Sequence, residues 1–145
     1  MDQYPKDPKT ISFIRSSASL VGKHFKLHEF ECSDCVCQTQ LISLELVERL
    51  DKLRDLLGQP IYINSGYRCQ RKQDLLKAKG YETAPINSPH TLGCAADIRS
   101  DNRTGVQIEA FARQAGFTCV GVARWWVHVD IRMGEKRWAY TKRTF

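Results

Sequence analysis

The chain has 145 residues, of which 42% are hydrophobic and 26% are charged. This length is enough for one compact domain with a hydrophobic core, but it is too short for two domains of ordinary size. No run approaches the roughly 18 consecutive apolar residues that span a bilayer, so we expect no membrane insertion. A formal net charge of +6 favours polyanionic partners, but the basic residues are spread out and accompany no helix-turn-helix, so we expect a solvated basic surface and no specific nucleic-acid partner.

Residues 1–24 are weakly patterned and predict either an N-terminal arm or a short helix, whereas residues 25–145 carry the patterns of a folded domain. The segment from Met1 to Thr10 contains Asp, Lys and Pro where a secretory signal would have its apolar stretch. We therefore expect synthesis in the cytoplasm without a signal peptide.

Leucine and valine residues recur at steps of three and four between Ser43 and Leu57, which predicts an amphipathic helix. Ser43 can cap its start and Gly58 can end it. Residues 61–63 follow a proline and are rich in β-forming side chains, and residues 64–66 read Asn-Ser-Gly, a turn signal. We therefore expect a strand that ends in a tight turn.

The middle of the chain predicts two further helices on either side of a buried strand. Residues 70–79 can form a short helix that Gly80 closes. Residues 93–98 are small and apolar, as in a buried strand that packs close to other backbone. Thr104 can cap a second amphipathic helix, which Gly116 can end.

The last third of the chain predicts strands at residues 117–122, 125–132 and 137–140, with a turn at residues 133–135. Helices therefore come early and strands cluster late. This order favours an α+β fold, a single domain with a mostly antiparallel sheet flanked by helices, over a parallel sheet with regularly alternating helices.

Two of the four histidines occupy positions suited to a metal site. His90 and Asp97 flank a small-residue segment around Gly93, where the chain can turn and return as a strand, so that both side chains can reach one ion. His128 can add a third ligand from a neighbouring strand. A catalytic zinc site needs three such ligands and one position for water. The alternative is that each histidine is an ordinary polar residue of the core or the surface.

Residues 125–132 are predicted to alternate between the two faces of a strand. Four side chains are expected on the face of a polar cleft, and three in the core: Trp126, His128, Asp130 and Arg132, against Val127, Val129 and Ile131. Because Asp130 shares a face with His128, it can act as a general base toward metal-bound water, or it can orient a ligand.

Three motifs occur in the order Ser65-Gly-Tyr-Arg68, Ser88-x-His90-x-x-Gly93-x-Ala95-Ala-Asp97-Ile98 and Val127-His128-Val-Asp130. Together they resemble the zinc D-Ala-D-Ala carboxypeptidase family, a branch of the fold shared with hedgehog-type and related murein peptidases. The resemblance covers roughly residues 25–132. It implies a hedgehog/D-Ala-D-Ala peptidase-like fold, with residues 25–145 as a zinc peptidase domain.

The resemblance also implies roles for individual residues. His90, Asp97 and His128 would be the ligands of one catalytic Zn²⁺. Arg68 would reach the substrate carboxylate or the developing oxyanion, a role suited to a planar and permanently charged guanidinium; the alternative is a surface arginine in a turn. Ser88 resembles a serine at the edge of the substrate cleft, but a hydroxyl that caps the loop is an equal alternative.

The sequence departs from the family at the general base. Many members carry an acidic residue or a histidine two or three positions before the last zinc ligand, where this chain has Trp126 and Trp125. We therefore predict that Asp130 accepts the proton of the zinc-bound water, that Arg68 helps to stabilise the oxyanion, and that Trp126 lines the substrate cleft. Residues 69–87 lack the Asn and Gly-Gly pattern of the nearest branch, which leaves the substrate specificity open.

The resemblance implies hydrolysis of an amide bond in peptidoglycan stem peptides, by a D-Ala-D-Ala carboxypeptidase or a murein endopeptidase. A phage-type lysin, released or carried on the virion, would reach the cell wall without a signal peptide, and we expect it to be a monomer. The alternative is a noncatalytic zinc-binding module that recognises wall peptides or a protein partner.

A cysteine cluster is the remaining unusual feature. Four cysteines can supply thiolates to a second, structural zinc site: Cys32, Cys35, Cys37 and Cys69. Buried or free thiols, or a disulfide between two of them, are the alternatives. Two further cysteines, Cys94 and Cys119, lie in apolar strand contexts and are expected in the core.

Overall fold

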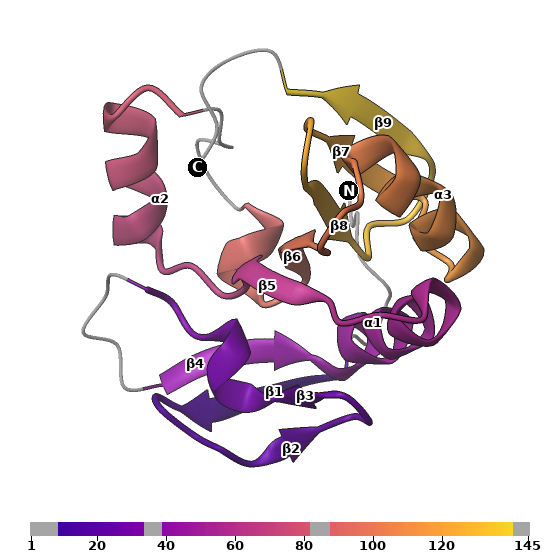
Figure 1. The fold of residues 1–145 in the computed structure, drawn as a ribbon. Helices are drawn as coiled ribbons and strands as arrows, with labels where there is room; N and C mark the ends of the chain where they lie inside the picture. The colour runs from indigo at the N-terminus through magenta and orange to yellow at the C-terminus, as the bar shows by residue number, and fades with distance from the viewer. Residues whose placement is uncertain (1–8, 34–38, 82–87, 141–145) are drawn as a thin grey trace.

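A computed structural model of the protein describes residues 9–33, 39–81 and 88–140. Its elements follow the chain in this order (Figure 1): β1 (Thr10–Ile14), β2 (Leu20–Val21), β3 (Phe25–Lys26), the 3₁₀ helix η1 (Leu27–Phe30), β4 (Thr39–Ser43), α1 (Leu44–Leu57), β5 (Tyr62–Ser65), α2 (Gln70–Ala78), the 3₁₀ helix η2 (Pro89–Leu92), β6 (Ala95–Arg99), α3 (Gly105–Gln114), β7 (Cys119–Val122), β8 (Val127–Asp130) and β9 (Lys136–Ala139).

The first part of the chain forms two small antiparallel sheets, in which β1 pairs with β4 and β2 pairs with β3. Phe13 is the buried residue of β1, and it joins the main hydrophobic core. Residues 10–14 lie in the segment where the sequence predicts an arm or a short helix. They form a strand instead, because their backbone groups find hydrogen-bonding partners along the whole of β4.

The larger sheet has five strands in the order β5-β6-β8-β7-β9. Its neighbouring strands are antiparallel except for β7 and β9, which run parallel. The last strand lies beside β7 because β8 already has a partner on each edge, β6 on one side and β7 on the other. The predicted α+β class with a mostly antiparallel sheet is confirmed.

The helices begin and end at the residues that the sequence predicts. Ser43 Oγ accepts the Leu46 N–H at 3.3 Å at the start of α1, and Gly58 ends the helix with a φ of +72°. Thr104 and Gln107 form a reciprocal capping box at the start of α3. None of the described helices is both long enough and apolar enough to cross a bilayer.

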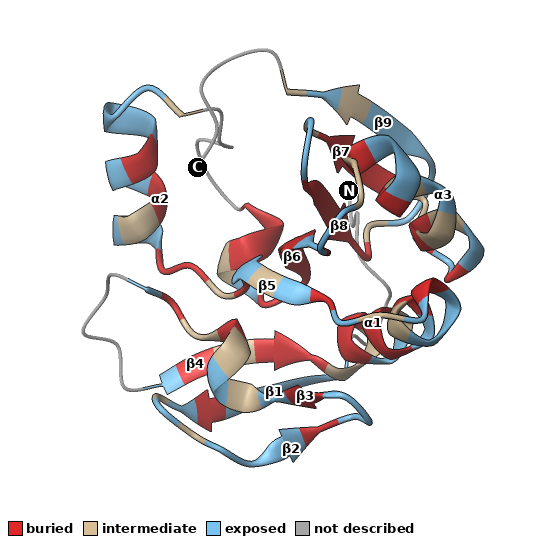
Figure 2. Ribbon diagram, viewed as in Figure 1, coloured by how far each residue is buried: buried red, intermediate tan, exposed pale blue. Residues whose placement is uncertain are grey.

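Helix α3 lies against β7 and β8 on one face of the five-stranded sheet, α1 lies next to α3 and also contacts β4 and β1, and α2 lies at the far side of the molecule (Figure 1). The sheet contributes alternate aliphatic residues to the shared core: Ile98, Val120, Val122, Val127 and Val129. Strand β8 is buried along its whole length, whereas β9 is largely exposed (Figure 2). The face of the sheet opposite α1 and α3 is therefore where polar side chains of the central strands gather.

Candidate metal centre

One row of residues crosses the five-stranded sheet on the face away from α1 and α3. The strand registers place neighbours opposite each other in the order Ser65, Asp97, His128, Gly121 and Trp138. Directly opposed residues of neighbouring strands point to the same face. Asp97 and His128, both predicted as metal ligands, are therefore direct cross-strand neighbours in the middle of this row.

His90 reaches the row from η2 instead of from the sheet. Ser88 caps η2 with its Oγ, which accepts the His90 N–H at 3.2 Å, and Gly93 ends η2 at a φ of +73°. His90 Nδ1 lies 2.7 Å from the carbonyl oxygen of Gly66, so Nδ1 carries the proton and Nε2 turns toward Asp97. The predicted turn at Gly93 thus brings His90 to Asp97, and the buried Ser88 serves as a capping hydroxyl.

The three predicted ligands come together. His90 Nε2 lies 3.3 Å and His128 Nδ1 lies 3.0 Å from Asp97 Oδ1, and one ligand atom from each residue lies within 4.8 Å of the others. Each residue is at most 5% exposed. Two imidazole nitrogens and a carboxylate oxygen form a donor set that fits Zn²⁺ or a similar divalent ion. The residues therefore have the chemistry of a metal centre.

Arg68 lies inside the molecule and holds Asp97. Its Nη2 lies 2.5 Å from Asp97 Oδ2, its Nε donates to Ser65 Oγ at 2.8 Å, and its Nη1 donates to Gln73 Oε1 at 3.2 Å. Arg68 is only 3% exposed, so the alternative of a surface arginine does not hold. Because the guanidinium binds Oδ2 of Asp97, Oδ1 is left to face the two histidines. Contact between Arg68 and a substrate stays a prediction.

Asp130 holds His128 from the other side. Its Oδ2 lies 2.8 Å from His128 Nε2, and Arg132 donates to both carboxylate oxygens from its backbone N–H and its guanidinium. The carboxylate is fully buried. As predicted, His128 and Asp130 share one face of β8, and Arg132 follows two residues after the end of the strand. A carboxylate on the far nitrogen of a metal-ligating histidine fixes the tautomer and the orientation of the ring.

The side chains of the cluster shift one another's protonation. Burial raises the pKa of Asp97, but His90 and Arg68 outweigh it and hold that pKa well below its usual range. Burial lowers the pKa of His128, but hydrogen bonds to Asp130 and Asp97 outweigh it and raise the pKa to about 8. Burial, with the charge of Arg68, lowers the pKa of His90. Without a metal, therefore, Asp97 is ionised, His90 is neutral and His128 is protonated near pH 7.

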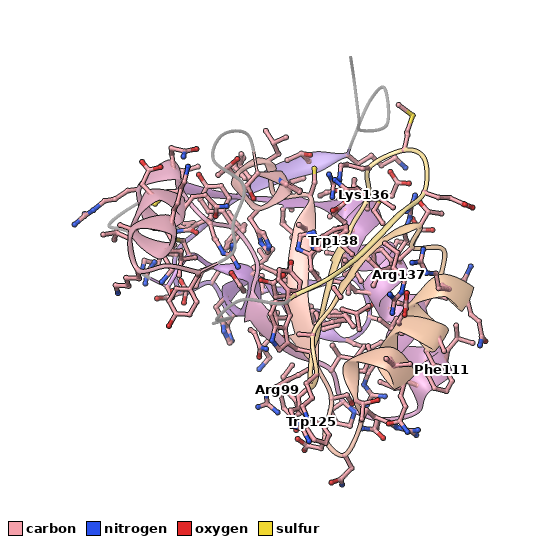
Figure 3. The ribbon with its side chains drawn as sticks, turned by 90° about the horizontal axis from the view of Figure 1, so that it is seen from above. Arg99, Phe111, Trp125, Lys136, Arg137 and Trp138 are labelled. Atoms are coloured by element: carbon pink, nitrogen blue, oxygen red, sulfur yellow. The ribbon has the colours of Figure 1, made fainter. Side chains whose placement is uncertain are left out.

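An aromatic side chain that the sequence patterns did not single out covers one side of the cluster. Trp138 lies over Gly121, where an added Cβ would be 2.5 Å from the indole, and its ring centroid is 5.2 Å from that of His128. Trp138 and Arg137 lie on opposite sides of β9, with Arg137 toward α3 (Figure 3). The parallel pairing of β9 with β7 brings Trp138 here, and no local sequence pattern reveals that pairing.

Trp125 and Trp126 are adjacent in sequence but lie in different surroundings. Trp126 is buried, and its ring packs at 4.9 Å from that of Tyr140, which in turn lies 6.4 Å from Trp138. Trp125 is 55% exposed and lies far from Trp138 (Figure 3). Trp126 therefore belongs to an aromatic group beside His128, and its predicted contact with a substrate stays a prediction.

The cysteines fall into two groups. Cys32 and Cys69 are buried and lie side by side, with Sγ atoms 3.9 Å apart. Cys35 and Cys37, predicted to belong with them, lie outside the described residues. Two other cysteines are buried in the strand region, as predicted: Cys94 and Cys119.

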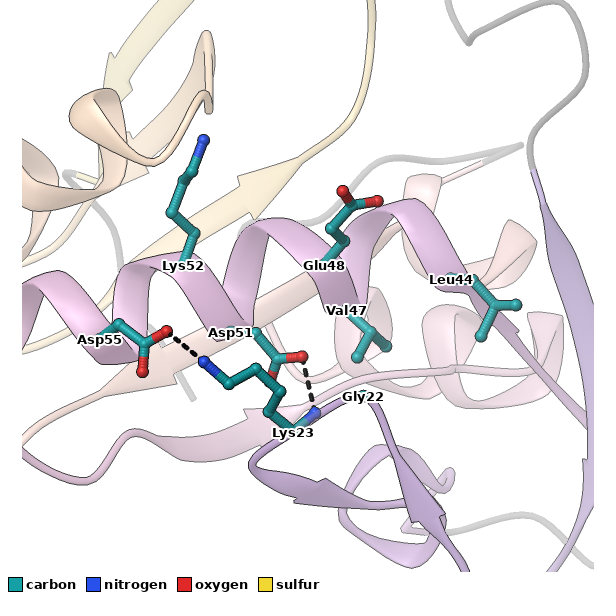
Figure 4. A pocket seen from close by; sticks show the side chains of 8 residues that line it. All are labelled: Gly22, Lys23, Leu44, Val47, Glu48, Asp51, Lys52 and Asp55. Carbon is teal, nitrogen blue, oxygen red and sulfur yellow. Dashed lines mark hydrogen bonds and ion pairs between the residues drawn. The ribbon is translucent and has the colours of Figure 1, made fainter.

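A hollow of about 580 Å³ lies elsewhere, between α1 and the turn at Gly22 and Lys23 (Figure 4). Its polar groups bind one another: Asp51 accepts the backbone N–H of Lys23 at 2.8 Å, and Lys23 Nζ lies 2.9 Å from Asp55. None of the predicted site residues lines it. The cluster around Asp97 therefore remains the candidate site.

Two histidines and an aspartate thus lie together on one face of a helix-backed sheet, with the donor set of a three-residue metal site. A family model described as Peptidase M15 matches residues 23–130, more than half of the chain, and the chain therefore belongs to peptidase family M15. The crystal structure of the L-Ala D-Glu endopeptidase ChiX from Serratia marcescens is similar with a TM-score of 0.47 and 20% sequence identity, over 62% of this chain and 80% of that chain. A comparison with curated protein sequences finds no match.

Proposed function

We propose that the protein is a zinc metallopeptidase that hydrolyses an amide bond in peptidoglycan stem peptides, as a D-Ala-D-Ala carboxypeptidase or a murein endopeptidase. The observation that carries this proposal is that His90, Asp97 and His128 each offer one ligand atom within 4.8 Å of the others, in a chain of peptidase family M15. A Zn²⁺ ion held by these atoms would lower the pKa of a bound water and polarise the scissile carbonyl.

The contacts behind the three ligands support this assignment. The Gly66 carbonyl binds Nδ1 of His90, and Asp130 binds Nε2 of His128, so each ring turns its other nitrogen toward Asp97. Arg68 binds the outer oxygen of Asp97. Such partners of the ligands preorganise a metal site, and their loss typically weakens metal binding by about 10- to 100-fold.

Asp130 is our proposed general base, and Arg68 our proposed group for the oxyanion or the substrate carboxylate. Both carboxylate oxygens of Asp130 already accept hydrogen bonds from His128 and Arg132. Proton transfer from a water would require one of these bonds to be exchanged for a bond to that water. The same contacts also fit a second role, in which Asp130 only orients His128.

The proposed substrate class rests on the order of the three motifs, which resemble those of D-Ala-D-Ala carboxypeptidases. Ser88 and Trp126 are the further residues proposed to contact the peptide. The net charge of +6 suits an anionic cell wall. We further propose a monomer that acts on the wall after release or as part of a virion.

Trp125 and Trp126 stand where many relatives carry an acidic residue or a histidine, and this departure favours a second candidate function. A noncatalytic module would use the same metal cluster to recognise a wall peptide. It predicts zinc-dependent binding of muropeptides without any cleavage.

The test is to incubate the zinc-loaded protein with purified muropeptides and to identify the products by liquid chromatography and mass spectrometry. We expect cleavage, its loss in His128→Ala, and unchanged cleavage in His24→Ala. His24 is a suitable control because it pairs with the exposed Asp55 at 2.7 Å and has no part in the cluster. Fully zinc-loaded protein that binds these peptides but leaves them intact would overturn the peptidase proposal in favour of the module. The masses of the products identify the bond that is cut.

A further inference from the structure

One cation has no anionic partner on the face of the sheet that carries the candidate metal centre. The strand registers place Lys136 opposite Cys119, which in turn lies opposite Asp130, in the row next to the one that contains His128. Lys136 is exposed, and its ammonium lies 5.6 Å from the ring centroid of Trp138. Within residues 9–33, 39–81 and 88–140, no side chain forms an ion pair or a hydrogen bond with this ammonium. Its charge is therefore available to an anion from outside the chain.

The two arginines close to the candidate metal centre are already engaged. Arg68 is 3% exposed and donates to Asp97 and to two other side chains. Arg132 donates to both carboxylate oxygens of Asp130. Either arginine would have to give up a bond to a buried carboxylate in order to bind an anion of a substrate, and a buried charge left without its partner is costly. Lys136 has no such bond to give up.

Trp138 links Lys136 to the metal-ligand cluster. Its half-buried indole lies over Gly121, and its ring centroid is 5.2 Å from that of His128. Lys136 lies close to this indole (Figure 3), and the guanidinium carbon of Arg132 lies 5.4 Å from the same centroid. A few charged or polar groups on an apolar wall are what orients a ligand in a binding site. The indole with the ammonium beside it suits a ligand that carries a carboxylate next to an apolar group.

The distances on either side of the indole limit how far an anion on Lys136 can lie from the reacting bond. The Trp138 centroid is 5.2 Å from the ring of His128 and 5.6 Å from the ammonium of Lys136. An extended peptide advances about 3.3–3.6 Å per residue, so a carboxylate bound by Lys136 belongs to a residue within about three positions of a bond that is cut at the metal.

We propose that Lys136, beside the indole of Trp138, binds a carboxylate of the substrate peptide within about three residues of the scissile bond. This inference rests on the proposed function, because it names a part of that substrate. A lysine suits the task, since its ammonium is a compact charge on a flexible stem and can follow a carboxylate without a fixed planar geometry. The subsite would make the protein prefer peptides with a free carboxylate at this position over the same peptides with a carboxamide.

The test compares muropeptides that differ by a single charge. A pentapeptide stem with lysine at its third position has two carboxylates, the α-carboxylate of its D-glutamate and that of its C-terminus, and each is replaced in turn by a carboxamide. Binding to the zinc-loaded protein is measured by titration calorimetry, and cleavage as kcat/KM. We expect one of the two replacements to lower wild-type affinity and kcat/KM by about tenfold, the effect of losing one hydrogen bond between charged groups. Lys136→Met should cause the same loss with the free acid and none with that carboxamide.

Arg137→Gln is the matched control, because Arg137 is the next residue of β9 and carries the same charge but pairs with Glu109 on the other side of the strand. This variant should keep the wild-type preference. Equal losses in the two variants, or a wild-type protein that treats all of the peptides alike, overturn the subsite and leave the peptidase proposal standing where cleavage occurs. Binding with the tenfold preference but without cleavage supports the subsite and overturns the peptidase proposal. Zinc-loaded protein that neither binds nor cleaves any of the peptides overturns both.

Discussion

Arg68 and Asp97 form a buried ion pair in which Arg68 binds one carboxylate oxygen of Asp97 and leaves the other for two histidines. Nη2 of Arg68 lies 2.5 Å from Oδ2, while Oδ1 lies 3.3 Å from His90 Nε2 and 3.0 Å from His128 Nδ1. The two carboxylate oxygens therefore have different partners: Oδ2 pairs with the guanidinium of Arg68, and Oδ1 faces the two histidines. It also lowers the pKa of Asp97, together with His90, so the carboxylate is an anion and ready to bind a cation.

Replacing Arg68 by lysine should weaken zinc binding by about 10- to 100-fold, the usual effect of losing a group that orients a metal ligand. Lysine keeps the positive charge but lacks the planar fork that joins Asp97, Ser65 and Gln73. Competition with a chromogenic chelator measures the affinity. Arg99→Lys serves as the control, because Arg99 lies on the same strand as Asp97 but is exposed and pairs with Asp101. Equal zinc affinity in the wild type and Arg68→Lys would contradict this role.

Replacing Asp130 by asparagine distinguishes its two proposed roles. As a general base, Asp130 should contribute about 10²- to 10⁴-fold to kcat, so the variant should lose this activity even when it is fully loaded with zinc. As a group that only orients His128, it should instead affect zinc affinity, and the fully zinc-loaded variant should retain its kcat. We expect the first result. The measurements are metal content and kcat on muropeptides at saturating zinc, and full activity of the loaded variant would eliminate Asp130 as the base.

Gly121→Ala should destabilise the protein by about 1–3 kcal/mol, the usual cost of overpacking. An added Cβ would lie 2.5 Å from the indole of Trp138, and the backbone of a central strand cannot move away freely. Urea unfolding gives the free-energy change. Trp138→Leu should remove most of the clash, so the double variant should be more stable than the sum of the two single changes predicts. Strict additivity would show that the two residues do not touch.

Zinc affinity should fall as the pH decreases below about 8. The pKa of His128 is raised to about 8 in the metal-free protein, so below this pH a proton occupies the ring that must bind the metal. Burial and the charge of Arg68 lower the pKa of His90, so a proton competes less with the metal for this ring. We expect a loss of about tenfold in affinity per pH unit between pH 8 and 6, with release of about one proton per zinc bound. Titration calorimetry in buffers of different ionisation enthalpy measures both, and a flat affinity across this range would contradict the prediction.

Sequence patterns predicted the helices because their signals are local. The three- and four-residue steps before Gly58 and the cap at Ser43 involve neighbours in the chain, as does the turn at Gly93 that returns the chain from His90 to Asp97. The ligand set was predictable for a related reason: the motifs around His90 and His128 retain a recognisable order of residue types. The strand nature of residues 10–14 was not predictable, because it depends on a partner strand about thirty residues away.

The amino-acid sequence by itself therefore determined the α+β class, the helix ends and the identity of three candidate metal ligands. Only the tertiary structure decided how those ligands are held. Three features depend on the registers of β5 to β9 and on the turns between these strands. They are the contact of Arg68 with Asp97, the bond of Asp130 to His128 and the placement of Trp138 over Gly121. A register shift of one residue in these strands would turn Asp97, His128 and Trp138 to the opposite face of the sheet. Register is set by the packing of the whole core, which no short stretch of sequence contains.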